Sequence, residues 1–363
     1  MLLPVSLMSF SSLFAAQNDP LTQAAYTRMA RHIVSALKPQ SGERVILRYD
    51  AENLPALEPV LRKALEEAGA VVETMPYGPA QNFEQRLDRT DIYIWLPTGP
   101  NTTPPDQANA LVKWLDGGRG RQIHFHWGDG TRATDGINGT HSEAYDRVYL
   151  EALDIDYAAL DKQMERAISK LRSGEVRVTT PAGTDINFRV GDRPFCKQNG
   201  DASKARMSGA KVRIDREIEL PAGALRVAPV ESSVNGTMVI PWARIGSTEV
   251  KDIRLEIREG AVTTATSATH QEALKRYIDS GPGLKLFREL AIGFNPKLIT
   301  PRGERWVAYY GYGAGVVRLG LGDNEELGGE ARGLPVRWLF FQDATVRVGN
   351  DVLVDAGRLV VSD

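Results

Sequence analysis

The pattern of apolar and polar residues divides the chain into two halves with different predicted structures. In the first half, β-rich runs at residues 44–49 and 122–127 alternate with segments that have apolar residues at helical spacing, such as residues 54–69 and 106–115. Strands that alternate with helices are typical of a parallel sheet covered by helices. We therefore predict an α/β domain over residues 19–171.

The second half has short strand patterns separated by Gly and Pro turns. Runs such as residues 176–179 and 253–257 are rich in β-branched residues, and their apolar and polar positions alternate. The only helices expected here lie around residues 270–280 and 283–291. This pattern predicts a β-rich α+β domain over residues 172–363.

Residues 1–18 have features of a signal or leader segment. Met1 to Ala16 is apolar and uncharged, and polar residues follow it, as after a secretory signal. However, no basic residue precedes the apolar stretch, and Phe14 lies three residues before a cut after Ala16, where a small residue is usual. The sequence leaves both a cytoplasmic and an exported protein open. No stretch reaches the roughly 20 apolar residues that a membrane-spanning helix needs.

The charge balance favours a peptide or another small molecule as partner over a nucleic acid. The chain has 44 Lys and Arg residues against 46 Asp and Glu residues, so it lacks the basic excess of a nucleic-acid-binding protein. Its single cysteine, Cys196, excludes an intramolecular disulfide and a cysteine-rich metal site.

Five segments in the second half match segments of a known protein family, in the same order and at plausible spacings. These segments include Pro-Ala-Gly-Thr-Asp and Glu-Leu-Ala-Ile-Gly-Phe-Asn-Pro, and they lie at residues 181–185, 220–223, 228–237, 289–296 and 320–329. In this order they resemble the aminopeptidase T family of metallopeptidases. The first half is similar to that family from residue 42 to residue 167, so the resemblance covers nearly the whole chain.

The resemblance implies a two-domain, homodimeric exopeptidase that uses two divalent metals, zinc or cobalt, to remove N-terminal amino acids. Two neighbouring cations polarise the scissile carbonyl and lower the pKa of a bridging water. The family is also similar to an iron-dependent ring-cleaving dioxygenase of hydroxypyridine breakdown, whose chemistry likewise needs histidine and carboxylate ligands.

The family's metal ligands are only partly present. Glu231 and Glu289 match its first two ligand positions, but Arg318 stands where the family has a histidine. Arg337 and Leu339 stand where it has a His-x-Asp pair. No histidine follows residue 270. Two carboxylates alone rarely hold a transition metal, so we predict a degenerate two-metal site, to which no catalytic residue can be assigned.

Arginine offers a physical replacement for the missing metals. Carboxylates in a closed pocket without a cation pay a large desolvation cost, and a guanidinium group can bind them bidentately. We expect Arg318 and Arg337 to point into the former metal site, and at least one of them to lie within salt-bridge distance of Glu231 or Glu289. Such a pocket suits a peptide or a small carboxylate ligand. The alternative is that both arginines are surface strand residues.

His124, His126 and Asp129 form a secondary candidate site. The two histidines are two residues apart on a predicted strand, so they share a face, and the aspartate follows near the strand end. The carboxyl ends of parallel strands are where α/β domains bind ligands. This spacing is compatible with a metal site. It is also compatible with histidines that only pack or form hydrogen bonds within a cleft.

Three functions remain open from the sequence. The first is a protein of aminopeptidase T type that binds a peptide or carboxylate without ordinary aminopeptidase activity. The second is an active metal-dependent hydrolase that combines Glu231 and Glu289 with a histidine from elsewhere: His124, His126 or His270. The third is a non-catalytic protein that binds peptides or mediates dimerisation.

Overall fold

The computed structural model describes residues 21–97 and 103–361. The possible leader at residues 1–18 therefore lies outside the described residues. Within the described ranges, none of the helices is long and apolar enough to cross a bilayer.

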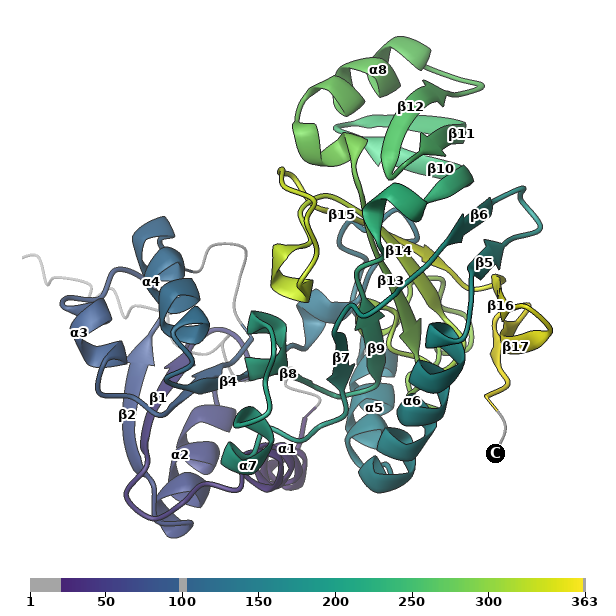
Figure 1. Ribbon diagram of the computed structural model, residues 1–363. Coiled ribbons are helices and arrows are strands. Elements are labelled where there is room, and N and C mark those ends of the chain that lie inside the picture. The colour runs from purple at the N-terminus through teal and green to yellow at the C-terminus, as the bar shows by residue number, and fades with distance from the viewer. Residues whose placement is uncertain (1–20, 98–102, 362–363) are drawn as a thin grey trace, which may run out of the picture.

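A five-stranded parallel sheet lies at the centre of the N-terminal half (Figure 1). In spatial order its strands are β2 (Val71–Pro76), β1 (Arg44–Tyr49), β3 (Ile92–Trp95), β4 (Arg121–Phe125) and β8 (Glu217–Leu220). The helices of this half are α1 (Gln23–Leu37), α2 (Leu57–Glu67), α3 (Phe83–Leu87) and α4 (Pro105–Asp116). The prediction of an α/β fold with a parallel sheet is confirmed.

Alternation along β1 explains why helices cover both faces of this sheet. Val45 and Leu47 pack with α1 and α2, whereas Ile46 between them packs with α3 and α4 on the other face. Strand β8 comes from the second half of the chain and pairs in parallel with β4. The predicted sheet of the first half thus includes one strand that lies after residue 171 in the sequence. The domain division at residue 171 stays a prediction.

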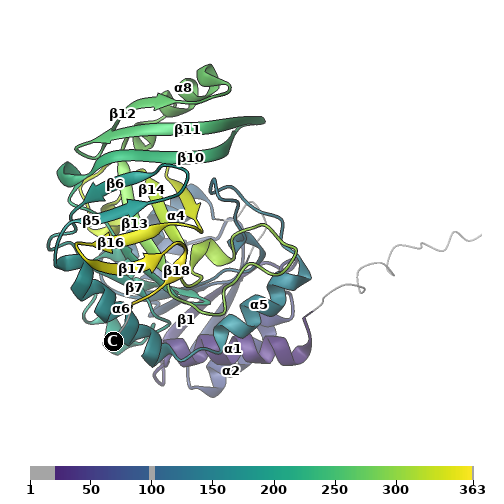
Figure 2. The same ribbon diagram turned by 90° about the vertical axis from the view of Figure 1, so that its right-hand side faces the viewer.

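The remainder contains two antiparallel sheets whose facing side chains form a common apolar core. The larger sheet has the order β12 (Ala261–Thr266), β11 (Thr248–Arg258), β10 (Asn235–Ile245), β6 (Asp185–Phe188), β5 (Val176–Thr179), β16 (Thr345–Val348), β17 (Asp351–Asp355) and β18 (Arg358–Leu359), as the row of strands in Figure 2 shows. The smaller sheet has the order β15 (Arg337–Phe341), β14 (Val317–Leu321), β13 (Phe287–Gly293), β9 (Ala224–Val227) and β7 (Phe195–Gln198). This confirms the β-rich α+β prediction.

Helices and short helical turns connect these sheets. The helices are α5 (Glu143–Leu153), α6 (Tyr157–Arg172), α7 (Lys204–Met207) and α8 (Gln271–Asp279). The 3-10 turns are η1 (Gly128–Gly130), η2 (Arg213–Arg216), η3 (Glu231–Ser233), η4 (Pro282–Lys285), η5 (Tyr309–Gly311) and η6 (Glu325–Leu327).

The prediction of a helix at residues 283–291 is wrong. Glu289 lies on a buried strand instead, which changes its environment. Only Pro282–Lys285 forms a short 3-10 turn, and Phe287–Gly293 is strand β13. All seven residues of β13 are buried, because it lies between β14 and β9 and both of its faces are covered. A strand buried on both faces lacks the alternation that separates strands from helices in sequence.

Candidate functional site

The smaller sheet has one apolar face and one charged face. Leu290 and Ile292 of β13 point into the core, so Glu289 and Ala291 point to the opposite side. Ala291 lies opposite both Arg226 of β9 and Arg318 of β14. Since residues directly opposite each other share a face, pairing of the strands brings both arginines beside Glu289.

A β-bulge adds a third arginine to this face. The β13–β14 register shifts between Phe287 and Glu289, and Arg288 lies at the shift. Gly320 lies opposite Glu289, and a Cβ atom there would be 3.1 Å from both Arg288 Cδ and Glu289 Cγ. The absence of a side chain at residue 320 leaves room for the two adjacent charged side chains.

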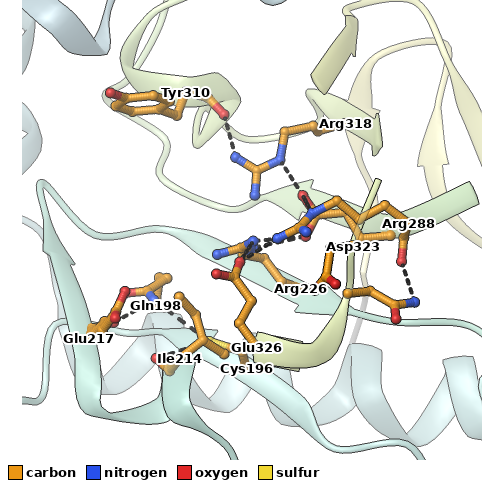
Figure 3. Close-up of polar contacts among 12 residues, drawn as sticks. Cys196, Gln198, Ile214, Glu217, Arg226, Arg288, Tyr310, Arg318, Asp323 and Glu326 are labelled. Atoms are coloured by element: carbon orange, nitrogen blue, oxygen red, sulfur yellow. Dashed lines mark hydrogen bonds and ion pairs between the residues drawn. The ribbon is translucent and has the colours of Figure 1, made fainter. Parts of the chain in front are cut away.

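Three guanidinium groups share two carboxylates in this cluster. Arg226 donates from Nε to Glu289 Oε2 at 3.0 Å and from Nη2 to Glu326 Oε1, on η6, at 2.9 Å. Arg318 Nε lies 3.2 Å from Glu289 Oε1, and Arg288 donates to Glu326. The predicted salt bridge between Arg318 and a family ligand position is therefore confirmed. We call these five residues the arginine cluster; Figure 3 shows Arg226 and Arg288 beside Glu326, with Arg318 close by.

The cluster keeps Glu289 ionised. Burial raises the pKa of its carboxyl group, but Arg226, Arg318 and Arg288 outweigh burial and lower this pKa to about 2. The side chain is completely buried. Glu289 is therefore an anion at neutral pH and cannot donate a proton as a general acid.

Arg318 has donors that the protein does not use. Its Nη1 donates to the Tyr310 carbonyl at 3.4 Å, as Figure 3 shows. Its Nη2 is buried and has no hydrogen-bond partner among the described residues. The indole Nε1 of Trp338 is also buried and has no hydrogen-bond partner among the described residues. The Arg318 Cζ atom lies 5.0 Å from a Trp338 ring centroid. Two neighbouring side chains thus hold unused buried donors.

The negative charge of Glu231 is neutralised by groups outside the arginine cluster. Its Oε2 accepts from Arg193 at 2.5 Å, and its Oε1 accepts from Asn324 Nδ2 at 2.9 Å and from the Glu330 amide at 2.7 Å. Burial raises the pKa of Glu231, but these hydrogen bonds and Arg193 outweigh it, so the net shift is downward. Asn324 Nδ2 also donates to the Arg288 carbonyl at 3.1 Å, which links Glu231 to the arginine cluster.

Arg337 does not join this site, contrary to the expectation for the former metal position. It lies 3.3 Å from Asp135 Oδ2 and donates to the Arg244 carbonyl at 3.4 Å. Arg318 pairs with Phe340 across the strands, so Trp338 and Phe340 share its face of the sheet, whereas Arg337 and Leu339 face the other way. Leu339 accordingly lies in the apolar core.

The residues at the family's metal positions do not fit a pair of metals. Both oxygens of Glu289 face guanidinium groups, and both oxygens of Glu231 accept hydrogen bonds. Arg318 places a fixed positive charge where a ligand would be needed, and a cation there would be repelled.

His124 and His126 lie in a second cluster, close to the first. His124 of β4 lies opposite Glu219 of β8, and His126 follows one residue after β4 ends. One donor atom from each of these three residues lies within 4.8 Å of the others. Sequence reasoning missed Glu219, because the pairing of β8 with β4 joins segments almost a hundred residues apart.

Asp129 supports this second cluster without joining its donor set. Its Oδ2 lies 2.7 Å from His126 Nδ1, and its Oδ1 accepts from the Trp127 amide at 3.0 Å. Burial lowers the pKa of His126, but Asp129 outweighs burial and the net shift is upward. Burial, assisted by His126, lowers the pKa of His124 to about 4, so this ring is neutral at pH 7.

Two tyrosines connect the two clusters. Tyr312 donates a hydrogen bond to Glu219, and the Arg318 Cζ atom lies 5.8 Å from the centroid of its ring. The ring of Tyr310 lies 4.9 Å from that of His126, and its carbonyl accepts from Arg318. Each of the two tyrosines therefore contacts both Arg318 and a residue of the second cluster.

Comparison with known proteins supports the fold and points to two enzyme families. The NicX family model, described as 2,5-dihydroxypyridine 5,6-dioxygenase, matches residues 152–289, which is less than half of the chain. Comparison with curated protein sequences finds no match.

Two solved structures share the fold over almost their whole length. A 2,5-dihydroxypyridine dioxygenase from Pseudomonas putida KT2440 aligns with a TM-score of 0.67 and 16% identity, over 95% of this chain and 99% of that chain. AmpT from Thermus thermophilus aligns with a TM-score of 0.60 and 15% identity, over 93% of this chain and 100% of that chain. The resemblance to aminopeptidase T thus holds for the fold, and the dioxygenase shares that fold too.

Proposed function

We propose that this protein binds a small ligand with a carboxylate group, such as a peptide, at the arginine cluster. The observation that carries the proposal is the surplus of guanidinium: Arg226, Arg288 and Arg318 share only Glu289 and Glu326. The contacts within this network leave one positive charge without a carboxylate. A ligand carboxylate would supply the missing negative charge.

The unused donors of Arg318 and Trp338 support this proposal. A buried donor without a partner costs about 1–3 kcal/mol, and more when the group is charged. A carboxylate can accept from a guanidinium through two oxygens, which also fixes its orientation. Because Arg318 and Trp338 are largely covered, the ligand enters only if a covering side chain moves.

The same geometry argues against two-metal peptide hydrolysis. That reaction needs two cations to polarise the carbonyl and activate a water. Here both surviving carboxylates are already neutralised: Glu231 by hydrogen bonds from Arg193, Asn324 and a backbone amide, and Glu289 by the guanidinium groups around it. In the proposed complex, the cluster binds and orients the ligand's carboxylate, and Glu289 remains an anion held by three guanidinium groups.

Calorimetric titration with a matched pair of probes tests the proposal. L-leucyl-L-leucine carries a carboxylate, and L-leucyl-L-leucine amide differs only by its neutral amide. We expect the dipeptide to bind at least about tenfold more tightly, because ionic hydrogen bonds contribute about 1.5–3 kcal/mol. R318M should remove this preference, and R347M, at an exposed position of β16, should keep it. Equal affinity for both probes, or a preference that survives in R318M, would contradict the proposal.

A second candidate function is metal-dependent catalysis. Its supporting observation is the proximity of His124, His126 and Glu219. Release of N-terminal residues from peptides, measured with added zinc, cobalt or manganese, tests the hydrolase form of this candidate. Turnover that depends on Glu231 and Glu289 would favour the two-metal mechanism instead.

A further inference from the structure

We infer that His124, His126 and Glu219 bind one divalent transition-metal ion, at a site separate from the family's metal positions. These are the residues on which the second candidate function rests, and an ion there is independent of the proposed carboxylate ligand, which binds at Arg318. The inference assigns the protein a metal centre built mainly on the N-terminal sheet.

The fold brings three donors of suitable kind to one edge of this sheet. Strands β4 and β8 are parallel neighbours, so their carboxyl ends meet at the same edge, where α/β sheets bind ligands. His124 and Glu219 are direct partners across the strands, and His126 lies two residues beyond His124, on the same side. All three side chains point to one place because of strand pairing and alternation.

The spacing of the donor atoms is close to that of a metal site. The three atoms lie within 4.8 Å of one another. Ligands about 2 Å from an ion lie up to about 4 Å apart, so closing around an ion requires movements of about 1 Å or less. Two imidazoles and one carboxylate are the protein ligands of zinc hydrolases and of non-haem Fe(II) enzymes, in which other positions on the metal stay open.

The surrounding hydrogen bonds are of the kind that orient metal ligands. Asp129 Oδ2 holds Nδ1 of His126 at 2.7 Å, which leaves the other ring nitrogen as the donor atom. Metal-bound histidines almost always have such a carboxylate or carbonyl partner on the second nitrogen. Tyr312 donates to Glu219, and the side-chain amide of Gln122 lies 2.8 Å from His124 Nε2. With its unpartnered oxygen turned to the ring, this amide accepts from the Nε2–H and leaves Nδ1 as the donor atom.

A purely structural role explains these residues less well. The rings of both histidines do pack on Trp95, at centroid distances of 5.7 and 4.8 Å. Yet the Glu219 carboxylate lies within 4.8 Å of a ring nitrogen of each histidine and forms an ion pair with neither in the described part of the chain. All three side chains are also only partly buried, so an ion can reach them.

Metal titration of the full-length protein tests this inference. Protein purified without an affinity tag and stripped with chelator is titrated separately with Zn²⁺, Co²⁺ and, without oxygen, Fe²⁺. Bound metal is then measured by mass spectrometry. We expect one ion per chain, a visible Co²⁺ spectrum, and two imidazole ligands in X-ray absorption. Absence of stoichiometric binding by all three ions would overturn the inference.

Variants locate the bound ion. H126Q and E219Q should weaken binding at least about 100-fold, and D129N should weaken it about 10- to 100-fold, the usual cost of losing an orienting partner. E231Q and E289Q should bind as the wild type does, and so should H270Q, whose histidine precedes α8. Binding that is lost in E289Q, or retained in both H126Q and E219Q, would refute the assignment.

Two further measurements separate a loss of metal binding from misfolding of a variant and from failure of the proposed ligand site. Circular dichroism establishes that each variant is folded, and the X-ray absorption of the wild type stands even if a variant fails to fold. Dipeptide titration of the metal-free protein separates the two proposals, because carboxylate binding at Arg318 does not require the ion. Loss of dipeptide binding with intact metal binding would reject the proposed ligand site alone.

Discussion

Two buried groups in this protein pair arginine with glutamate, and they differ in their balance of charge. In the N-terminal half, Arg121 donates from both terminal nitrogens to Glu43, at 2.9 and 2.8 Å, so one buried guanidinium meets one carboxylate. Lys204 lies 3.9 Å from the same carboxylate but is largely exposed. In the arginine cluster, three guanidinium groups meet two carboxylates. Arg121, Glu43, Glu289 and the three arginines of the cluster are almost fully covered, and only Glu326, at 26% exposure, reaches solvent.

This difference separates a structural pair from a candidate binding site. The Arg121 pair joins β4 to the segment before β1, and both terminal nitrogens of Arg121 donate hydrogen bonds, although its buried Nε has no partner among the described residues. The arginine cluster leaves Arg318 Nη2 and Trp338 Nε1 unpartnered within the described ranges. A surplus of one charge sign in a covered site costs stability unless a ligand compensates it. The balance of charge therefore distinguishes a structural ion pair from a candidate ligand site better than the number of ion pairs does.

The largest effect is expected when Arg121 is changed. R121M leaves the Glu43 carboxylate buried without its guanidinium, and breaking such a pair costs about 3–5 kcal/mol. Urea unfolding measures this loss. The double variant E43M/R121M should recover part of it, because no unpaired charge remains. R318M should change the free energy of unfolding by only about 1 kcal/mol, because Glu289 keeps Arg226. Equal destabilisation by R121M and R318M would contradict the distinction between a structural ion pair at Arg121 and a ligand site at Arg318.

A smaller effect is expected in the acid dependence of stability. The pKa of Glu289 is about 2 in the folded protein, against an ordinary value of 4.5. A lowered pKa contributes stability that is complete above pH 4.5 and is lost as the pH falls towards 2. The contribution is about 3 kcal/mol at most.

Urea unfolding at decreasing pH checks this expectation. E289Q should lose stability less steeply below pH 4.5 than the wild type does. The matched control is E175Q, at an exposed residue, which should follow the wild type. Identical acid dependence in E289Q and the wild type would show that the arginine cluster does not hold this carboxylate ionised.

The smallest effect concerns Cys196, which lies opposite Arg226 on the charged face of the smaller sheet. Burial raises the pKa of its thiol to about 12, although Arg226 opposes this shift. At about pH 8 the folded protein should react with a disulfide reagent at least about 100-fold more slowly than a free thiol. Unfolding in urea should restore full reactivity. Rapid reaction of the folded protein would show that this face opens readily.

The overall fold was largely predictable, because its signals are local. The β-rich composition of residues 44–49 and the helical spacing at residues 54–69 depend on neighbouring positions, and both elements formed with shifts of a few residues or less. Strand β13 was not predictable, because its covered faces depend on β9 and β14, which lie far away in sequence.

The candidate sites were only partly predictable, for the same physical reason. The family resemblance led us to expect Arg318 or Arg337 beside Glu231 or Glu289, and the pair that forms is Arg318 with Glu289. Arg226, Arg288 and Glu326 were missed, because only strand pairing and a bulge bring them together. The expectation for Arg337 failed because it required the register between β14 and β15, which places it on the opposite face. Alternation within one strand gives no information about its neighbour.

The attachment of β8 to β4 has a consequence for how this chain is made. The N-terminal sheet cannot be completed until the ribosome has added residue 220, long after its other four strands have emerged. Until then β4 presents a free edge with unsatisfied backbone groups. During synthesis, the nascent chain therefore passes through a state that is open to wrong pairing, and a chaperone that shields this edge would protect it.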